Sequence, residues 1–125
     1  MIYVAMKIKR DGGKQSPVAV GVYTDREMAD EKVNELISSG TKKDDAWVDT
    51  STCDDAEWWR TNVGVGSTVY PVWAIESKRP VSGLIDTVQV FKEYAEQYID
   101  EEMQNNKERC SWLKGFIVLE CEFKG

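Results

Sequence analysis

Two neighbouring tryptophans followed by an arginine, Trp58, Trp59 and Arg60, are the residues best suited to contact a partner. Neighbouring side chains point to opposite faces of a strand and diverge by about 100° on a helix. We therefore expect one indole in the core and the other at least partly exposed. An exposed tryptophan beside an arginine is typical of a binding hot spot, or of a platform on which a base stacks. The alternative is that long loops cover both indoles, since tryptophan is largely buried on average.

A long acidic segment supplies the second candidate surface. Apolar residues, Phe91 among them, recur there at helical spacing, which predicts an amphipathic helix over about 82–109. Residues 83–109 include seven acidic and three basic side chains, so this part holds four of the chain's six net negative charges. Its polar face, with Glu96 and Asp100, suits docking of a basic partner or mimicry of a phosphate backbone. The alternative is the solvated side of an ordinary amphipathic helix.

The same segment contains residues that favour a strand. Thr87, Val88 and Val90 are β-branched, so a strand over 86–91 followed by a shorter helix is the alternative. We predict the continuous helix because the helical spacing is unbroken and propensity is a weak prior. On that helix Tyr94 and Val90 lie beside the apolar stripe, and an apolar spot among carboxylates suits a partner or a self-association surface.

Several chemistries are excluded because the sequence contains no histidine. Serine–histidine–aspartate and cysteine–histidine catalysis, histidine general bases and histidine metal ligands are therefore ruled out. The sequence has no phosphate-binding loop, dinucleotide fingerprint or calcium loop. Cys53, Cys110 and Cys121 lack the close spacing of a zinc site or a disulfide framework, so we expect reduced thiols. We predict no catalytic residue, no metal and no cofactor.

Carboxylates are the only abundant acid–base groups. An enzyme built on them, with or without a metal, needs two or more to converge in a cleft, and the candidates are Asp49, Asp54, Asp55 and Glu57. Runs of like charge are usually solvated loops. The charges of Asp54 and Asp55 also disfavour the thiolate of Cys53, and with it a nucleophilic role. We rank this interpretation last.

The totals favour one small acidic domain over residues 1–125. Acidic residues outnumber basic ones by 22 to 16, which gives a net charge of −6 and a pI near 4.7. Such a surface repels phosphate backbones and anionic membranes, which argues against direct binding to nucleic acid or to a membrane. No apolar run is long enough to span a bilayer, and charges from Lys7 onward do not fit a signal peptide. We expect a cytoplasmic protein.

The first third of the chain has the clearest pattern. Apolar residues alternate over 2–8 and again over 18–22, and the glycines within 11–14 accept positive φ, so we predict a β-hairpin. The next predicted element is a helix over about 25–39. Thr24 begins the spacing of a capping box for this helix, in which its hydroxyl accepts from the amide three residues later.

Residues 41–67 are the least regular part. Ala46 to Asp49 form a possible short strand, and residues 54–60 fit a helical turn capped by Ser51 or Thr52. A strand over 57–62, paired with the following strand through glycine-containing residues 64–67, fits the same residues. We favour this hairpin because the valines there flank glycines rather than helix formers.

Two more strands are expected, over 68–76 and 116–123, and Pro71 in the first points to a sheet edge or a bulge. The predicted order is β-β-α-β-β-α-β. It describes an α+β fold, a mostly antiparallel sheet of about five strands with two amphipathic helices packed on it. Apolar–aromatic pairs at 22–23 and 90–91 both lead into helical spacing, but the gaps differ, so we favour coincidence over duplication.

The expected function is that of a small acidic, non-enzymatic protein-binding module that covers a functional site on a larger protein. Its size, acidity and α+β pattern are similar to those of many small accessory proteins of phages and mobile elements, including inhibitors of host machinery. The predicted partner is a larger protein with a basic surface, and the sequence also allows a homo-oligomer. The predicted binding residues are Trp58, Trp59, Arg60, Tyr94, Glu96 and Asp100.

The alternative function is binding or sequestration of a small, nucleotide-like ligand. A tryptophan would stack on the base, and Arg60 or the pair Lys78–Arg79 would neutralise its charge.

Overall fold

The computed structural model describes residues 1–76 and 82–125. The first half contains β1 (Ile2–Asp11), β2 (Lys14–Tyr23), α1 (Arg26–Ser38), the 3₁₀ helix η1 (Lys43–Asp45), β3 (Ala46–Ser51) and α2 (Ala56–Asn62). The second half contains β4 (Thr68–Ile75), β5 (Gly83–Gln89), α3 (Lys92–Asn105), α4 (Lys107–Cys110), β6 (Gly115–Val118) and β7 (Cys121–Glu122). The predicted α+β class is confirmed, with 34% of the described residues helical and 40% in strands. The predicted charge pair Lys78–Arg79 lies outside the described residues.

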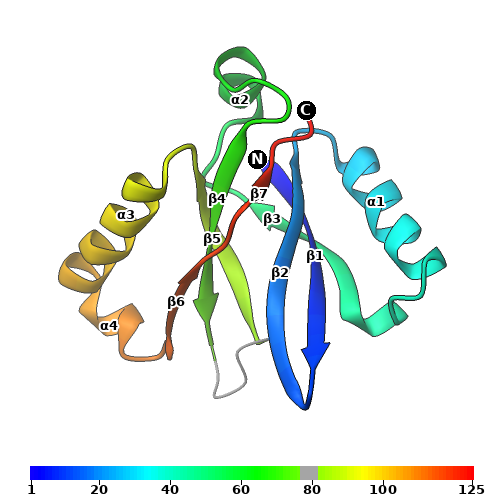
Figure 1. Cartoon of the computed structure of the whole chain (residues 1–125). Helices are drawn as coiled ribbons and strands as arrows, with labels where there is room; N and C mark the ends of the chain where they lie inside the picture. Colours follow the sequence, from blue (N-terminus) through cyan, green and yellow to red (C-terminus); the bar gives the residue numbers. More distant parts are fainter. Residues whose placement is uncertain (77–81) are drawn as a thin grey trace.

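Two antiparallel sheets pack face to face, and a helix covers the outer face of each (Figure 1). The strand order is β2-β1-β3 in the first sheet and β5-β4-β6 in the second, where β7 also pairs with β4. Helix α1 lies on the first sheet and α3 on the second, at opposite sides of the molecule. Sequence analysis expected one sheet; the strands divide between two because β4 is apolar on both faces and is covered on both.

Large side chains from both sheets form the core between them. Strand β1 contributes alternate residues, as its period-2 pattern predicts, and β4 contributes residues from the facing sheet. Helix α2 and the segment after β7 complete the core from one end. The largest members, all at most 2% exposed, are Ile2, Met6, Trp59, Val69, Trp73 and Phe123. No described helix is long and apolar enough to cross a bilayer.

The predicted N-terminal hairpin and first helix are confirmed. Gly12 and Gly13 have φ values of 54° and 88°, as a two-residue hairpin turn requires. The helix cap differs from the prediction. Asp25 caps α1 by accepting from the Glu27 amide at 2.9 Å, whereas Thr24 is buried and bonded to another element. The capping box predicted on Thr24 is therefore wrong.

The long helix predicted over 82–109 is wrong in its first third, which is strand β5, and α3 begins at Lys92. The prediction failed because β5 contains a β-bulge at Asp86, where the pairing of β4 with β5 shifts register. The bulge brings Ile85 and Val88 to the same buried face, and this three-residue step resembles helical spacing. The strand propensity of the β-branched residues was the better guide here.

Two further details of the middle are corrected. The hairpin favoured for 57–66 is wrong: residues Ala56–Asn62 form α2, capped by Asp55, whose carboxylate accepts from the Glu57 amide at 3.1 Å. Pro71 lies in β4, the central strand of its sheet, so it does not mark an edge. Its partner in β5 is Val88, and the register shift lies beyond it, between Val72 and Trp73, so Pro71 is not part of the bulge either.

The chain folds as two similar ββαβ units. In each unit the first strand pairs with the other two, and the second strand carries a bulge, at Val20 in β2 and at Asp86 in β5. Both second strands end three residues after the bulge, and both helices begin six residues after it. Nine residues after each bulge lies the buried residue of the helix, Ala29 or Ala95, whose small side chain lets the helix approach the sheet.

This equivalence gives a structural basis to the echo seen in the sequence. The bulges place Val22 at the position of Val88, and both valines are buried. The echo seen in the sequence pairs Val22 with Val90, which lies two residues beyond the true equivalent, Val88. The distance from each valine to the helix alanine therefore differed by two residues. The matching topology and bulges favour duplication over coincidence.

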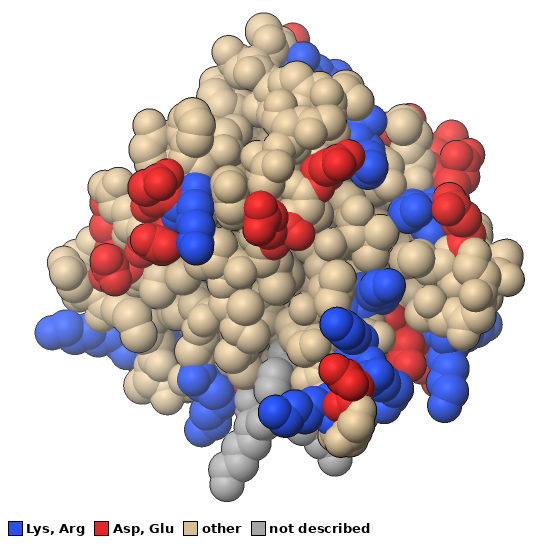
Figure 2. Space-filling view, viewed as in Figure 1, with Lys and Arg blue, Asp and Glu red and all other residues tan. Residues whose placement is uncertain are grey.

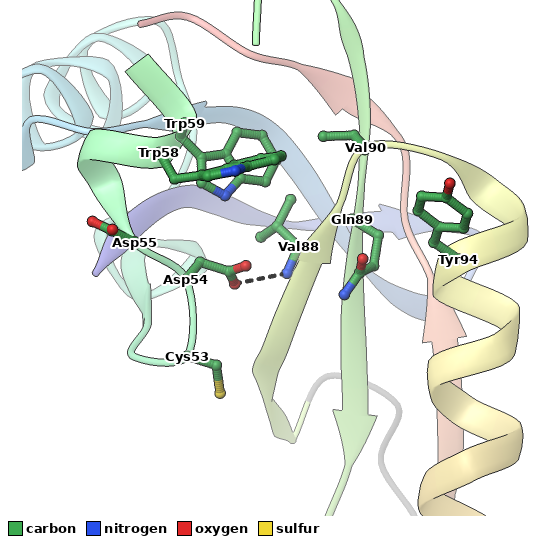
Figure 3. A pocket seen from close by; sticks show the side chains of 9 residues that line it. All are labelled: Cys53, Asp54, Asp55, Trp58, Trp59, Val88, Gln89, Val90 and Tyr94. Carbon is green, nitrogen blue, oxygen red and sulfur yellow. Dashed lines mark hydrogen bonds between the residues drawn. The ribbon is translucent and has the colours of Figure 1, made fainter. Parts of the chain in front are cut away.

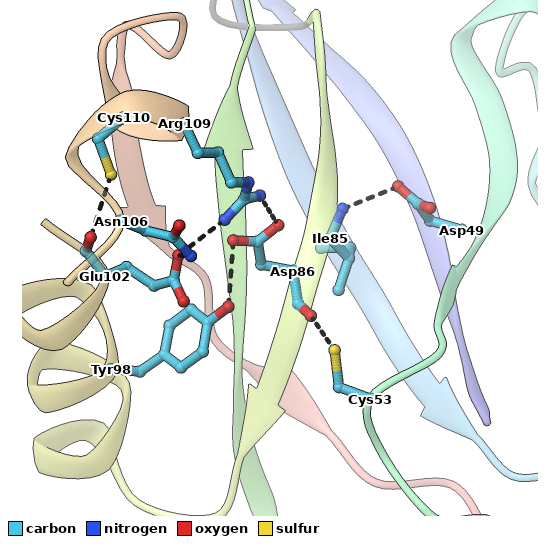
Figure 4. A network of polar contacts seen from close by, with 9 residues as sticks. All are labelled: Asp49, Cys53, Ile85, Asp86, Tyr98, Glu102, Asn106, Arg109 and Cys110. Carbon is cyan, nitrogen blue, oxygen red and sulfur yellow. Dashed lines mark hydrogen bonds and ion pairs between the residues drawn. The ribbon is translucent and has the colours of Figure 1, made fainter.

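Asp86 connects the second sheet with α3 and α4 (Figure 4). Its carboxylate is 5% exposed and accepts hydrogen bonds from the Tyr98 hydroxyl, at 3.2 Å, and from the Arg109 guanidinium. Arg109 also contacts Glu102 at 3.0 Å. The bond to Asp86 raises the pKa of Arg109, and burial raises the pKa of Tyr98, so Arg109 stays charged and Tyr98 stays protonated. The helix predicted over 82–109 would have left Asp86 on its solvated face, whereas β5 buries it.

We predict that Arg109→Gln lowers the free energy of unfolding by about 2 kcal/mol, because it leaves the Asp86 carboxylate buried without a cation. Urea denaturation measures the change. The matched control is Arg26→Gln, which removes an exposed pair with Asp30 and costs less than about 0.5 kcal/mol. Equal effects of the two substitutions would show that Asp86 does not depend on Arg109.

Candidate functional site

Helix α2 places one of its two tryptophans in the core and leaves the other exposed. Trp59 is 2% exposed and packs against Phe123, with ring centroids 5.4 Å apart. Trp58 is 49% exposed and meets Trp59 edge-on at 6.2 Å. The prediction of one buried and one exposed indole is confirmed, and Trp59 belongs to the core.

Arg60 anchors α2 to the first unit. Its Nε donates to the Thr24 hydroxyl at 3.1 Å, and its Nη2 donates to the Thr24 carbonyl oxygen at 3.4 Å. Thr24 lies at the junction between β2 and α1. The guanidinium therefore faces away from Trp58 and serves to hold α2, with Trp59, on the core.

Trp58 and Tyr94 stand on opposite sides of a hollow between α2 and the start of α3 (Figure 3). Two adjoining cavities, of about 340 and 510 Å³, share Trp58, Val90 and Tyr94 as walls. We call this hollow the aromatic pocket. Its first part is also lined by Asp54 and Asp55, and no lysine or arginine of the described residues lines either part.

Phe91 extends the aromatic wall, and sequence analysis missed it by assigning it to a buried stripe. It is 56% exposed and meets Tyr94, itself 51% exposed, edge-on at 5.2 Å. Phe91 occupies the N-cap position of α3 and makes no side-chain cap, whereas its equivalent in the first unit is the capping residue Asp25. An aromatic residue there forgoes about 1 kcal/mol of capping. The presence of phenylalanine at this position therefore points to a role on the surface. The lack of a capping residue before α3 was the signal in the sequence that could have revealed it.

Asp49 and Asp54, two of the carboxylates predicted as enzyme candidates, accept hydrogen bonds that join elements of the fold. Asp54 Oδ2 accepts from the Val88 amide at 3.0 Å and from the hydroxyls of Ser51 and Thr87, which joins the loop after β3 to β5. Asp49 accepts from the Ile85 amide at 3.2 Å, and burial raises its pKa. These bonds hold the two units together at one edge. Across the described chain, no group of three or more acidic or cysteine side chains is arranged to hold a metal.

Glu96 and Asp100 are exposed on α3 but do not join the aromatic pocket. A two-residue step along a helix turns about 200°, so Glu96 projects away from Tyr94. Figure 2 shows acidic side chains gathered over α3, whereas most lysines and arginines lie in the lower half of the view. Of the six predicted binding residues, the structure brings together Trp58 and Tyr94 as the exposed walls of the aromatic pocket, with the buried Trp59 behind them.

The usual burial of tryptophan places the other three, Trp47, Trp73 and Trp112, in the core or at its rim, and this holds for two of them. Trp73 is buried and Trp47 packs against it, with centroids 6.1 Å apart. Trp112 is 76% exposed, so its assignment is wrong. It lines a separate cavity with Leu84 and Arg109, which shares no residue with the aromatic pocket.

The three cysteines are free thiols. Burial raises the pKa of Cys121 to about 12, so that thiol stays protonated. Cys53 is exposed at the rim of the aromatic pocket, and its thiol donates to the Asp86 carbonyl oxygen at 3.4 Å.

Comparison of the chain with models of protein families, with curated proteins and with solved structures found no significant match.

The different burial of the two indoles predicts that truncating each to alanine lowers the free energy of unfolding by very different amounts. Trp59→Ala empties a large volume in the core and lowers the free energy of unfolding by about 4 kcal/mol. Trp58→Ala removes a half-exposed ring and costs about 1 kcal/mol or less. Urea denaturation of both variants measures the difference, and similar costs would contradict the structure of α2.

Proposed function

We propose that this protein is a small non-enzymatic module that binds a larger protein through its aromatic face. The aromatic face consists of Trp58, Phe91 and Tyr94, which are each about half exposed around the aromatic pocket. Their joint exposure is the observation that carries the proposal, because large aromatic side chains are enriched at the centres of protein interfaces. Soluble proteins seldom leave such side chains clustered in water without a partner.

The charge of this region indicates the chemistry of the partner. Asp54 and Asp55 line the pocket, and Glu93 is exposed on the first turn of α3. A basic surface complements these carboxylates and accelerates the encounter of the two proteins. Covering a functional site, as an inhibitor from a phage or mobile element does, is the action we propose for a module of this size. The free thiols fit a reducing, cytoplasmic setting.

A nucleotide-like ligand fits the pocket less well. The aromatic walls suit a base, but a phosphate group would face Asp54 and Asp55 with no lysine or arginine of the described residues lining the cavity. Arg60, the predicted charge partner, is bound to Thr24 instead. These contacts favour a cationic protein surface over an anionic small molecule.

We predict that affinity purification from the source cells recovers a stoichiometric protein partner with the wild-type chain. The double variant Trp58→Ala/Tyr94→Ala should recover at least tenfold less, because it removes the two walls of the pocket. Trp112→Ala is the matched control, since it removes an equally large exposed ring elsewhere and should keep the partner. Mass spectrometry quantifies recovery.

Charge reversal at Glu96 and Asp100 tests the second predicted surface in the same assay. We expect a change of about twofold or less, because these residues face away from Tyr94. Equal recovery by wild type and the double variant, or a nucleotide panel that raises the melting temperature while no protein is recovered, would overturn the proposed function.

A further inference from the structure

The repeated units provide two equivalent junctions between a strand and a helix. Thr24 and Val90 each lie four residues after the bulge and two residues before the first residue of the helix. The strand residues just before them pair alike, Tyr23 with Tyr3 and Gln89 with Tyr70. Backbone groups alternate sides along a strand, so those of Thr24 and Val90 face away from the paired strand.

At the first junction the chain binds an arginine of its own. Arg60 donates to the hydroxyl and to the carbonyl oxygen of Thr24. The guanidinium thus uses the outward-facing carbonyl of the junction as an acceptor. This contact shows which side chain the backbone geometry of such a junction accommodates.

At the second junction the corresponding space is the aromatic pocket. The Val90 carbonyl accepts no hydrogen bond from the described residues, and it lies on the same side of β5 as the Val88 amide that Asp54 binds. Asp54 uses Oδ2 for its three described bonds, so Oδ1 retains acceptor capacity. Figure 3 shows this carboxylate beneath Trp58, with Tyr94 across the hollow.

We propose that the aromatic pocket binds an arginine side chain of the partner protein. Its guanidinium donates to the Val90 carbonyl, as Arg60 donates to Thr24, and pairs with the Asp54 carboxylate, while Asp55 adds negative charge at the edge of the pocket. The planar group stacks on the Trp58 indole, an arrangement that arginine favours over lysine. This inference rests on the proposed function and names the residue type that the partner presents.

The probe is the peptide acetyl-Gly-Arg-Gly-amide, titrated at millimolar concentration into the ¹⁵N-labelled protein and followed by NMR. We expect shifts of the Trp58 indole signal and of the amides from Val90 to Tyr94. The same peptide with citrulline keeps the shape and loses the charge, so its binding should be roughly tenfold weaker. A lysine peptide should also bind more weakly, because it cannot stack its cation as a plane.

Two variants locate the site without disturbing the core. Trp58→Leu removes the stacking surface, and Asp55→Asn removes a charge while retaining a residue that caps α2. Each should weaken the arginine peptide severalfold, whereas Trp112→Leu should leave it unchanged. Tyr94→Leu, on the opposite wall, provides a second stacking variant in case Trp58→Leu unfolds.

The outcomes separate this inference from the proposed function. Equal binding of arginine and citrulline peptides, shifts outside the pocket, or unchanged binding by the stacking variants would overturn the arginine site, while purification of a partner through Trp58 would still stand. An arginine-specific shift without a protein partner would support the site and contradict the proposed function.

Discussion

The packing of Trp59 into the end of the core, against Phe123, is the contact on which the rest of the structure depends. It fixes the rotation of α2, because Arg60 then reaches Thr24 on one side and Trp58 is turned toward α3 on the other. A seven-residue helix has little stability of its own, so the buried indole and the arginine bonds supply most of what holds it in place. The aromatic pocket exists because this helix cannot rotate.

The two ββαβ units share a core and differ where one of them meets α2. Their equivalent junctions have the same backbone geometry, yet the first is closed by Arg60 and the second is bordered by exposed aromatic side chains. Replacement of a capping aspartate by Phe91 accentuates this difference. The usual choice of an N-cap residue is therefore absent beside the aromatic pocket, and such departures are common at functional sites.

The sequence predicted the N-terminal hairpin, the first helix, the α+β class and the divergence of the two indoles, because period-2 alternation and helical geometry are local. It could not predict β5, since the bulge at Asp86 produced a step that resembles a helix. It also could not reveal that Val90 and Trp58 share a pocket, because they lie on different elements brought together by packing. Among the predicted binding residues, Trp58, Trp59 and Tyr94 meet in space, and Trp59 is the buried one.

The most direct test of this account measures the solvent exposure of the two neighbouring indoles in one sample. A soluble paramagnetic agent added to the ¹⁵N-labelled protein attenuates NMR signals according to their accessibility. The account predicts strong attenuation of the Trp58 indole signal and protection of the Trp59 signal, which lies against Phe123. Protection of both indoles, or attenuation of Trp59 alone, would contradict the orientation of α2 and with it the aromatic pocket.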